Sequence, residues 1–134
     1  MHWALQLLGM AIGGALGGAA RFWLSGRIAR RIGEAFPWGT LVVNLTGAFA
    51  IGVLAALLAD RSAQAVLQMS LWTGLVIGVL GSYTTVSSFS LQTLALLRDG
   101  DYARAAGNVT ASVIGCLAAV SAGYLLVLQL WGRG

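Results

Sequence analysis

The chain contains no lysine, and it has one histidine, one cysteine, one proline and four acidic residues. Only 9% of its 134 residues are charged, whereas a soluble domain carries about 25%, so the chain has too few charges for a water-exposed surface. The single cysteine, Cys116, excludes an intramolecular disulfide and a cysteine-based metal site. All four acids fall between apolar stretches, so no carboxylate pair or nucleophile–base pair can be assembled. The sequence therefore predicts that this protein is not an enzyme.

Long apolar stretches make up most of the chain. Hydrophobic residues account for 58% of it, and its mean hydropathy is +0.84. A membrane-spanning helix needs about 20 mostly apolar residues, and four stretches qualify, with approximate bounds 3–32, 39–59, 66–97 and 103–131. We therefore predict an all-α, multi-pass protein of the cell inner membrane with a single domain over residues 1–134. The net charge of +4 comes from arginines near the ends of these stretches, where they meet lipid headgroups, so nucleic acid is not an expected partner.

The third stretch is too long for one straight crossing. As a single helix it would measure roughly 50 Å, against a hydrocarbon core of about 30 Å. Its centre, residues 81–88, reads GSYTTVSS, a cluster of poor helix formers. We predict that the helix is broken here, near mid-membrane. At that depth the freed backbone groups must be buried in protein, hydrated or bound to an ion.

Uncharged polar residues are the groups available for chemistry inside the membrane. Several recur four residues apart, which places them on one face of a helix, and two more flank the predicted break. These residues are Thr40 and Asn44 in the second stretch, Asn108, Ser112 and Cys116 in the fourth, and Ser87 and Ser88 at the break. Amide and hydroxyl groups can solvate a small anion, and conduction requires binding weak enough to let the ion leave. The alternative is ordinary hydrogen bonding between helices.

Residues 3–24 contain one charged residue, Arg21. Its side chain either extends to the membrane interface or draws anions into a vestibule. A membrane-embedded acid is the usual proton relay of a carrier, and this chain offers none, so a proton-coupled carrier is a weaker hypothesis than a passive pathway.

Glycines recur every four residues in the first stretch, at Gly9, Gly13 and Gly17. Small residues at this spacing let helix backbones approach closely, either within one subunit or across a dimer interface. Four short helices can hardly surround a pore alone, which favours an oligomer.

Two motifs carry a family resemblance. GTLVVN stands at residues 39–44 and GSYTTVSSFS at residues 81–90, with Arg21 in a GGAAR context and PWGT before the second helix. Together they resemble the Fluc fluoride channels, also called CrcB, over essentially the whole chain. The resemblance implies a fluoride-selective channel that exports fluoride passively, built as an antiparallel, dual-topology homodimer with two pores.

The resemblance also implies roles for individual residues. The candidate residues of the fluoride pathway are Asn44, Thr40, Val86, Phe89, Ser87, Ser88, Asn108, Ser112 and Arg21. A structural sodium ion would bind the backbone carbonyls of Gly81 and Thr84. Two positions depart from the family pattern. Val86 replaces the first of two pore phenylalanines and lacks the positive ring edge that attracts anions, and Asn108 stands where a tyrosine is often found.

The arginines are unevenly distributed between the two membrane faces. The connectors after the first and third stretches hold five, and the opposite face holds two: Arg27, Arg30, Arg31, Arg98 and Arg104 against Arg61 and Arg133. This favours a cytoplasmic location for those two connectors, whereas a dual-topology chain is nearly unbiased. One half of a heterodimeric fluoride channel is therefore an alternative. A structural or assembly subunit of a membrane complex is the alternative from another class.

Overall fold

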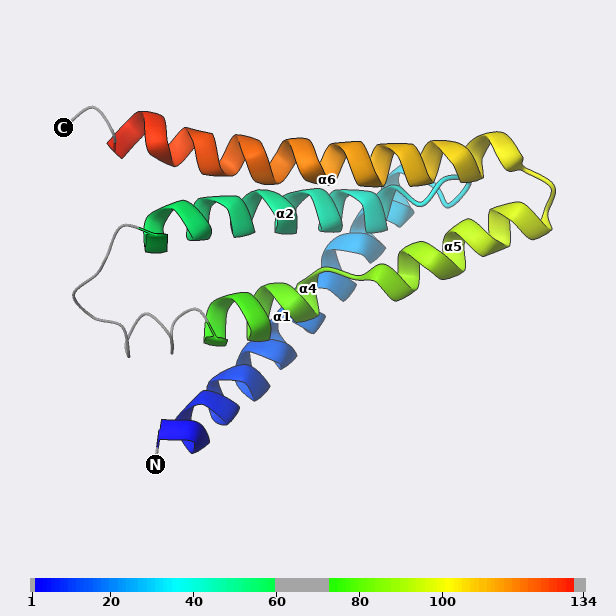
Figure 1. The fold of residues 1–134 in the computed structure, drawn as a ribbon. Helices are drawn as coiled ribbons and strands as arrows, with labels where there is room; N and C mark the ends of the chain where they lie inside the picture. The colour runs from blue at the N-terminus through cyan, green and yellow to red at the C-terminus, as the bar shows by residue number, and fades with distance from the viewer. Residues whose placement is uncertain (1, 60–72, 132–134) are drawn as a thin grey trace.

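A computed structural model describes residues 2–59 and 73–131, and nearly all of them are helical (Figure 1). The elements are α1 (His2–Ile32), α2 (Trp38–Ala59), the π-helical segment η1 (Thr73–Leu80), α4 (Gly81–Tyr83), α5 (Val86–Arg98) and α6 (Tyr102–Trp131). The described ranges contain no strand, so the predicted all-α class is confirmed.

Within the described ranges, three helices are long and apolar enough to cross a membrane: Gln6–Ile32, Trp38–Leu57 and Tyr102–Trp131. They correspond to the first, second and fourth predicted spans. The third predicted span begins inside residues 60–72, which lie outside the described residues, so that crossing stays a prediction.

The residues at the helix ends explain where the helices begin and stop. Gly33 adopts φ +93° after α1, and its N–H donates to the Ala29 carbonyl at 2.8 Å, as expected of a glycine that ends a helix. Pro37 directly precedes α2, a position where its missing N–H costs nothing. Gly100, at φ +76°, follows α5. Asp101 then caps α6, because its Oδ1 accepts from the Arg104 N–H at 3.1 Å.

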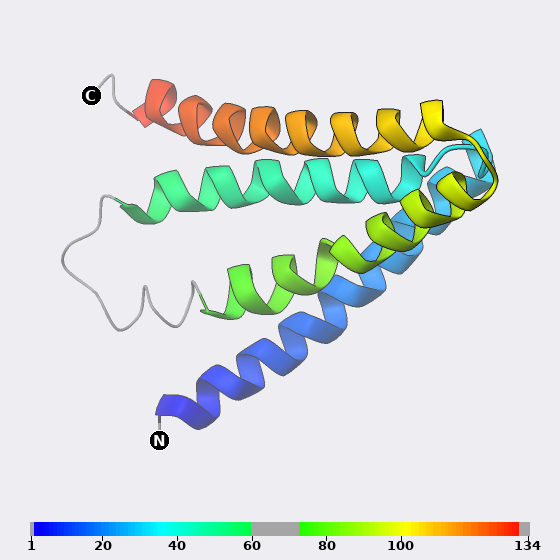
Figure 2. The same cartoon turned by 45° about the vertical axis from the view of Figure 1, so that its right-hand side comes forward.

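The helices pack as two groups (Figure 1). Helix α2 lies beside α6 and runs in the same direction, whereas α1 packs mainly on η1 and α4. Figures 1 and 2 agree that the C-terminal ends of α1 and α5 gather with the N-terminal ends of α2 and α6. We call this the connector end of the molecule. It carries both the α1–α2 connector and the α5–α6 turn.

Glycines are the points of closest helix contact. A Cβ on Gly17 of α1 would overlap the Val79 carbonyl oxygen of η1, and one on Gly13 would lie 2.9 Å from the Gly74 carbonyl oxygen. Gly9 has no such neighbour within 4 Å. Two of the three regularly spaced glycines therefore pack inside the subunit, because only a residue without a side chain lets the two backbones approach this closely.

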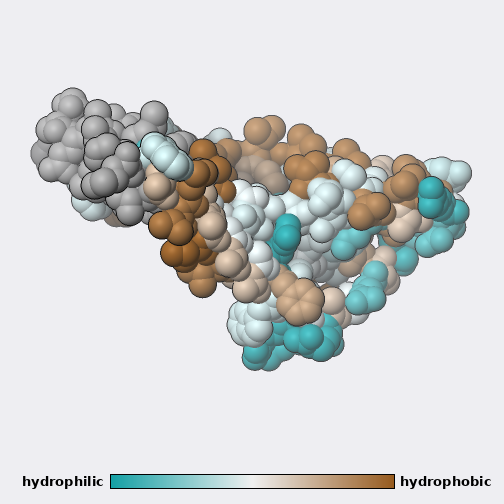
Figure 3. Space-filling model, turned by 90° about the horizontal axis from the view of Figure 1, so that it is seen from below, coloured by the Kyte–Doolittle hydropathy of each residue, from teal (hydrophilic) through white to brown (hydrophobic). Residues whose placement is uncertain are grey.

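Many large apolar side chains lie on the surface. Phe22 is 83% exposed, Leu16 62% and Leu117 63%. Figure 3 shows strongly apolar residues beside a pale middle and along the upper side of the view, and hydrophilic residues toward the right-hand end and the lower edge. This distribution suits lipid, or the apolar surface of another membrane protein, better than water.

Candidate functional site

The chain leaves the helical conformation at two consecutive threonines between α4 and α5. Thr84 has φ −75° and ψ 159°, and Thr85 has φ −151° and ψ 122°, so both are extended. The Thr85 hydroxyl then accepts from the Ser88 N–H at 3.1 Å and caps α5. Both residues are β-branched, a type that favours extended backbone, and threonine is a preferred N-cap.

Asn44 of α2 holds this extended segment through both of its polar groups. Its Nδ2 donates to the Thr85 carbonyl oxygen at 2.9 Å, and its Oδ1 accepts from the Thr85 N–H at 2.8 Å. Thr85 is only 7% exposed, and a buried backbone group without a partner costs about as much as a lost hydrogen bond. The side chain thus replaces helical hydrogen bonds that the extended backbone does not make.

A hollow of about 300 Å³ lies beside this pair, and we call it the central hollow. Its lining residues are Asn44, Ala48, Ile51, Thr84, Thr85, Val86, Phe89, Ser112, Val113 and Cys116. None of them is charged. Its side-chain polar groups are an amide, hydroxyls and one thiol, which are neutral groups able to contact an ion without fixing it by a full opposite charge.

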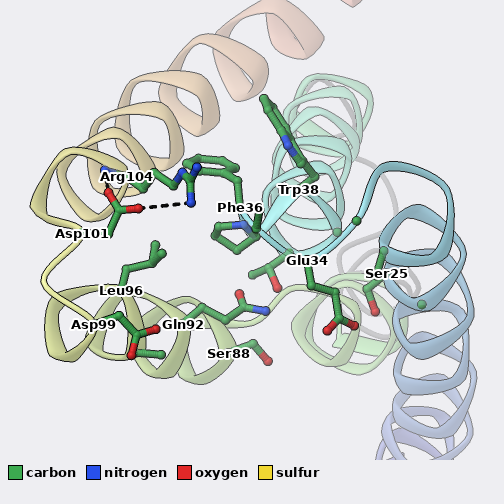
Figure 4. Close-up of a pocket in the computed structure, with 18 residues that line it drawn as sticks. Ser25, Glu34, Phe36, Trp38, Ser88, Gln92, Leu96, Asp99, Asp101 and Arg104 are labelled. Atoms are coloured by element: carbon green, nitrogen blue, oxygen red, sulfur yellow. Dashed lines mark hydrogen bonds and ion pairs between the residues drawn. The ribbon is translucent and has the colours of Figure 1, made fainter.

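A larger hollow, of about 700 Å³, opens at the connector end, and we call it the end hollow. Thr40, Ser88 and Gln92 line it together with three acidic residues. Figure 4 shows two of these acids, Glu34 and Asp99, beside the hollow, and the third, Asp101, joined to Arg104. The Asp101–Arg104 ion pair measures 3.1 Å.

Most of the predicted pathway residues line one or the other of these two hollows. Thr40 and Ser88 line the end hollow. Four others line the central hollow: Asn44, Val86, Phe89 and Ser112. Successive residues of a helix point about 100° apart, which is why neighbouring residues of α5 line different hollows.

The remaining predicted residues line neither hollow. The Ser87 side chain is exposed, and its hydroxyl lies 3.2 Å from that of Thr85. Asn108 is 2% exposed, and its Nδ2 donates to the Thr93 hydroxyl at 2.9 Å, which ties α6 to α5. Arg21 reaches toward the extended segment, with its Nη1 3.5 Å from the Thr84 carbonyl oxygen. Gly81 is exposed at the start of α4.

Two polar residues were missed by the sequence analysis. Gln92 lines the end hollow, and its Oε1 is buried without a hydrogen-bond partner. Thr93 accepts from Asn108 and donates to the Phe89 carbonyl oxygen at 2.7 Å. Gln92 follows Ser88 by four residues, the same helical spacing that identified the other polar pairs, so this signal was available. No comparable signal pairs Thr93 with Asn108.

The fold and the hollows define a class of protein: an all-α membrane protein whose central hollow is lined by uncharged groups. Among the described residues, no group of three or more histidine, cysteine or acidic side chains could hold a metal ion.

Comparison with known proteins gives the family. Residues 8–124 match the family described as CrcB-like protein, Camphor Resistance (CrcB). A relative in Bradyrhizobium diazoefficiens, named fluoride-specific ion channel FluC 2, is 52% identical over 126 residues, covering 94% of this chain and 91% of the relative. A protein of the same name in Rhodopseudomonas palustris is 60% identical over 119 residues, covering 88% and 89%. The fluoride-specific ion channel FluC of Opitutus terrae is 52% identical over 124 residues, covering 90% and 91%.

This chain belongs to the CrcB-like family. The predicted resemblance is thereby confirmed. The prediction that the protein is not an enzyme is also confirmed, because its relatives are named as ion channels.

Proposed function

We propose that this protein is a subunit of a fluoride channel that lets fluoride leave the cell passively across the inner membrane. The relatives named as fluoride-specific ion channels support this proposal. The observation that carries it is the central hollow, where the Asn44 amide, the Ser112 hydroxyl and the Phe89 ring meet without any charged residue. A neutral amide, a hydroxyl and an aromatic ring edge can each contact a small anion and release it again.

Each hollow would serve one part of the pathway. In the end hollow, which three acidic residues and Arg104 also line, the Thr40 and Ser88 hydroxyls would replace part of the water around the ion. In the central hollow, Asn44 has two amide hydrogens and uses one on the Thr85 carbonyl, so the second would be the donor to fluoride. Phe89 would present its ring edge there. Val86, which is 76% exposed at the start of α5, would contribute only aliphatic surface.

We further propose that the third crossing comprises η1, α4 and α5, interrupted at Thr84 and Thr85. The extended dihedral angles of both residues support an interruption. We also propose an antiparallel homodimer. The hollows of one chain are open to its surface, and the exposed apolar side chains of the helices would be covered by a second copy or by lipid.

The carbonyl of Gly81, and that of Thr84, which Arg21 Nη1 approaches at 3.5 Å, are the candidate ligands of the sodium ion that the family resemblance implies. In a continuous helix they would accept from the N–H groups of Thr85 and Ser88, but these donate to Asn44 and to the Thr85 hydroxyl instead. Carbonyl oxygens are suitable ligands for hard cations. Two per chain are few, so a second copy would supply the others. The ion would place a positive charge beside the interruption and join the two copies.

Purified protein in liposomes loaded with fluoride tests the proposed function. We expect fluoride efflux well above that of empty vesicles, and no comparable chloride efflux from chloride-loaded vesicles. We expect efflux without a proton gradient, because the central hollow, unlike the end hollow, contains no acidic side chain to relay protons. Fluoride efflux equal to that of protein-free vesicles would contradict the proposal.

Cys116 offers a separate test of the pathway. It lines the central hollow and is the chain's one cysteine, so a small thiol-reactive reagent modifies a single defined position. We expect the added group to fill part of the roughly 300 Å³ hollow and to slow fluoride efflux several-fold. Cys116→Ser, whatever its own efflux rate, should not respond to the reagent. Complete modification of Cys116 with unchanged efflux would place the pathway elsewhere.

A further inference from the structure

We infer that Gly47 of α2 is a positioning residue, which seats the Thr84 side chain against α2 and thereby fixes the backbone beside the central hollow. The effect on ion flux rests on the proposed channel function. The seating itself does not depend on that function.

The contact between Gly47 and Thr84 leaves no room for a side chain. Gly47 is buried, and a Cβ built on it would overlap the Thr84 Cγ2 methyl and lie 3.3 Å from Cδ1 of Tyr83. The methyl therefore occupies the space that any other residue at position 47 would need.

Thr84 cannot turn its methyl away without losing a hydrogen bond. Its hydroxyl donates to the Leu80 carbonyl oxygen at 2.9 Å, and its own N–H donates to the same oxygen, also at 2.9 Å. Rotation about χ1 would move the hydroxyl off this acceptor. A methyl group added at Gly47 must therefore displace the backbone of the extended segment and cannot be absorbed by a side-chain rotation.

The same face of α2 also binds Thr85, the residue that follows Thr84. Asn44 and Gly47 are three positions apart, so they are neighbours on the helix surface. Asn44 binds both backbone groups of Thr85. The Thr46 hydroxyl oxygen lies 2.8 Å from the Tyr83 hydroxyl oxygen. Tyr83, Thr84 and Thr85 thus each contact α2.

The position of Thr84 against α2 determines where one wall of the central hollow lies. Thr84 and Thr85 line that hollow, together with Val86 at the start of α5. A shift of Thr84 away from α2 moves this wall relative to Asn44 and Ser112, which approach the hollow from α2 and α6. An ion in the hollow could then no longer contact the displaced wall and the side chains of Asn44 and Ser112 at the same time. Gly47 itself would contact no ion.

A double-mutant cycle between Gly47→Ala and Thr84→Ser tests the inference. Serine keeps the hydroxyl that binds Leu80 but lacks the Cγ2 methyl, so it provides the space that the alanine methyl needs. We expect Gly47→Ala to reduce fluoride efflux at least about tenfold when residue 84 is threonine, and by less than about threefold when it is serine. The thermal midpoint of the purified protein should follow the same pattern.

Gly18→Ala is the matched control, because no atom outside its own helix lies within 4 Å of a Cβ placed there. It should leave efflux and thermal midpoint unchanged. If Gly47→Ala does not fold, recovery of folded protein in the double variant supports the inference. A double variant as defective as Gly47→Ala, in efflux or in folded yield, would overturn it. Wild-type protein without fluoride efflux would refute the proposed function, while the thermal cycle would still decide whether Thr84 is seated as inferred.

Discussion

Asn44→Asp is expected to abolish fluoride efflux, with a loss of at least about a hundredfold, which corresponds to roughly 2.7 kcal/mol. Two effects act in the same direction. The carboxylate cannot donate to the Thr85 carbonyl oxygen, which now accepts from Nδ2 at 2.9 Å. It also places a negative charge in a hollow whose lining contains no cation to pair with it. A negative charge at this depth repels an anion and is costly to bury.

Asn44→Ala separates these two effects. Alanine removes both hydrogen bonds to Thr85 but adds no charge, so its efflux should lie between those of wild type and Asn44→Asp. Both variants should be measured in liposomes after size-exclusion chromatography has shown that they are folded. Wild-type efflux from folded Asn44→Asp would remove Asn44 from the ion pathway.

Gly52→Ala is expected to prevent α2 and α6 from packing, with a loss of about 3 kcal/mol or more in stability. A Cβ on Gly52 would overlap the Val120 carbonyl oxygen and lie 3.0 Å from the Tyr124 nitrogen. These are backbone atoms of a helix, which cannot move aside as a flexible side chain can. Gly123 of α6 makes the reciprocal approach to the Phe49 carbonyl oxygen. The two glycines therefore let both helices approach each other from opposite sides.

The measurement is the yield of folded protein after detergent extraction, together with its thermal midpoint. We expect Gly52→Ala to give little folded protein or a midpoint many degrees lower. Gly18→Ala is again the control variant, because a Cβ at Gly18 would have open space around it. Equal midpoints for Gly52→Ala and wild type would mean that α2 and α6 do not pack as closely as this structure places them.

Much of the fold was accessible from sequence because hydropathy and helix length are local properties. Twenty apolar residues form a helix in lipid whatever their neighbours are, since a helix satisfies the backbone groups within a single segment. The bounds 39–59 and 103–131 accordingly lie within one residue of those of α2 and α6 at each end. The extended residues Thr84 and Thr85 lie within the run of poor helix formers at residues 81–88, and the break of a membrane-crossing helix at this run stays a prediction.

The site was only partly accessible, because polar spacing identifies a helix face but not what that face contacts. Asn44 was predicted as a pathway residue, and nothing local indicates that its amide binds the backbone of Thr85, 41 positions away. Likewise Ser87 and Ser88 were treated alike, yet Ser88 lines the end hollow and Ser87 does not.

By itself, the sequence determined the class of this protein, the places of three long apolar helices, the neutral polar groups available inside the membrane and, through two motifs, its family. Only the tertiary structure decided that α2 pairs with α6 and α1 with η1, that glycines 13 and 17 serve packing within the subunit, and that α2 holds the extended segment at Thr84 and Thr85. The physical reason is the separation along the chain of the residues that interact. Burial in lipid acts on each stretch separately, whereas helix pairing and the partners of freed backbone groups depend on residues that are distant in the chain and meet only after folding.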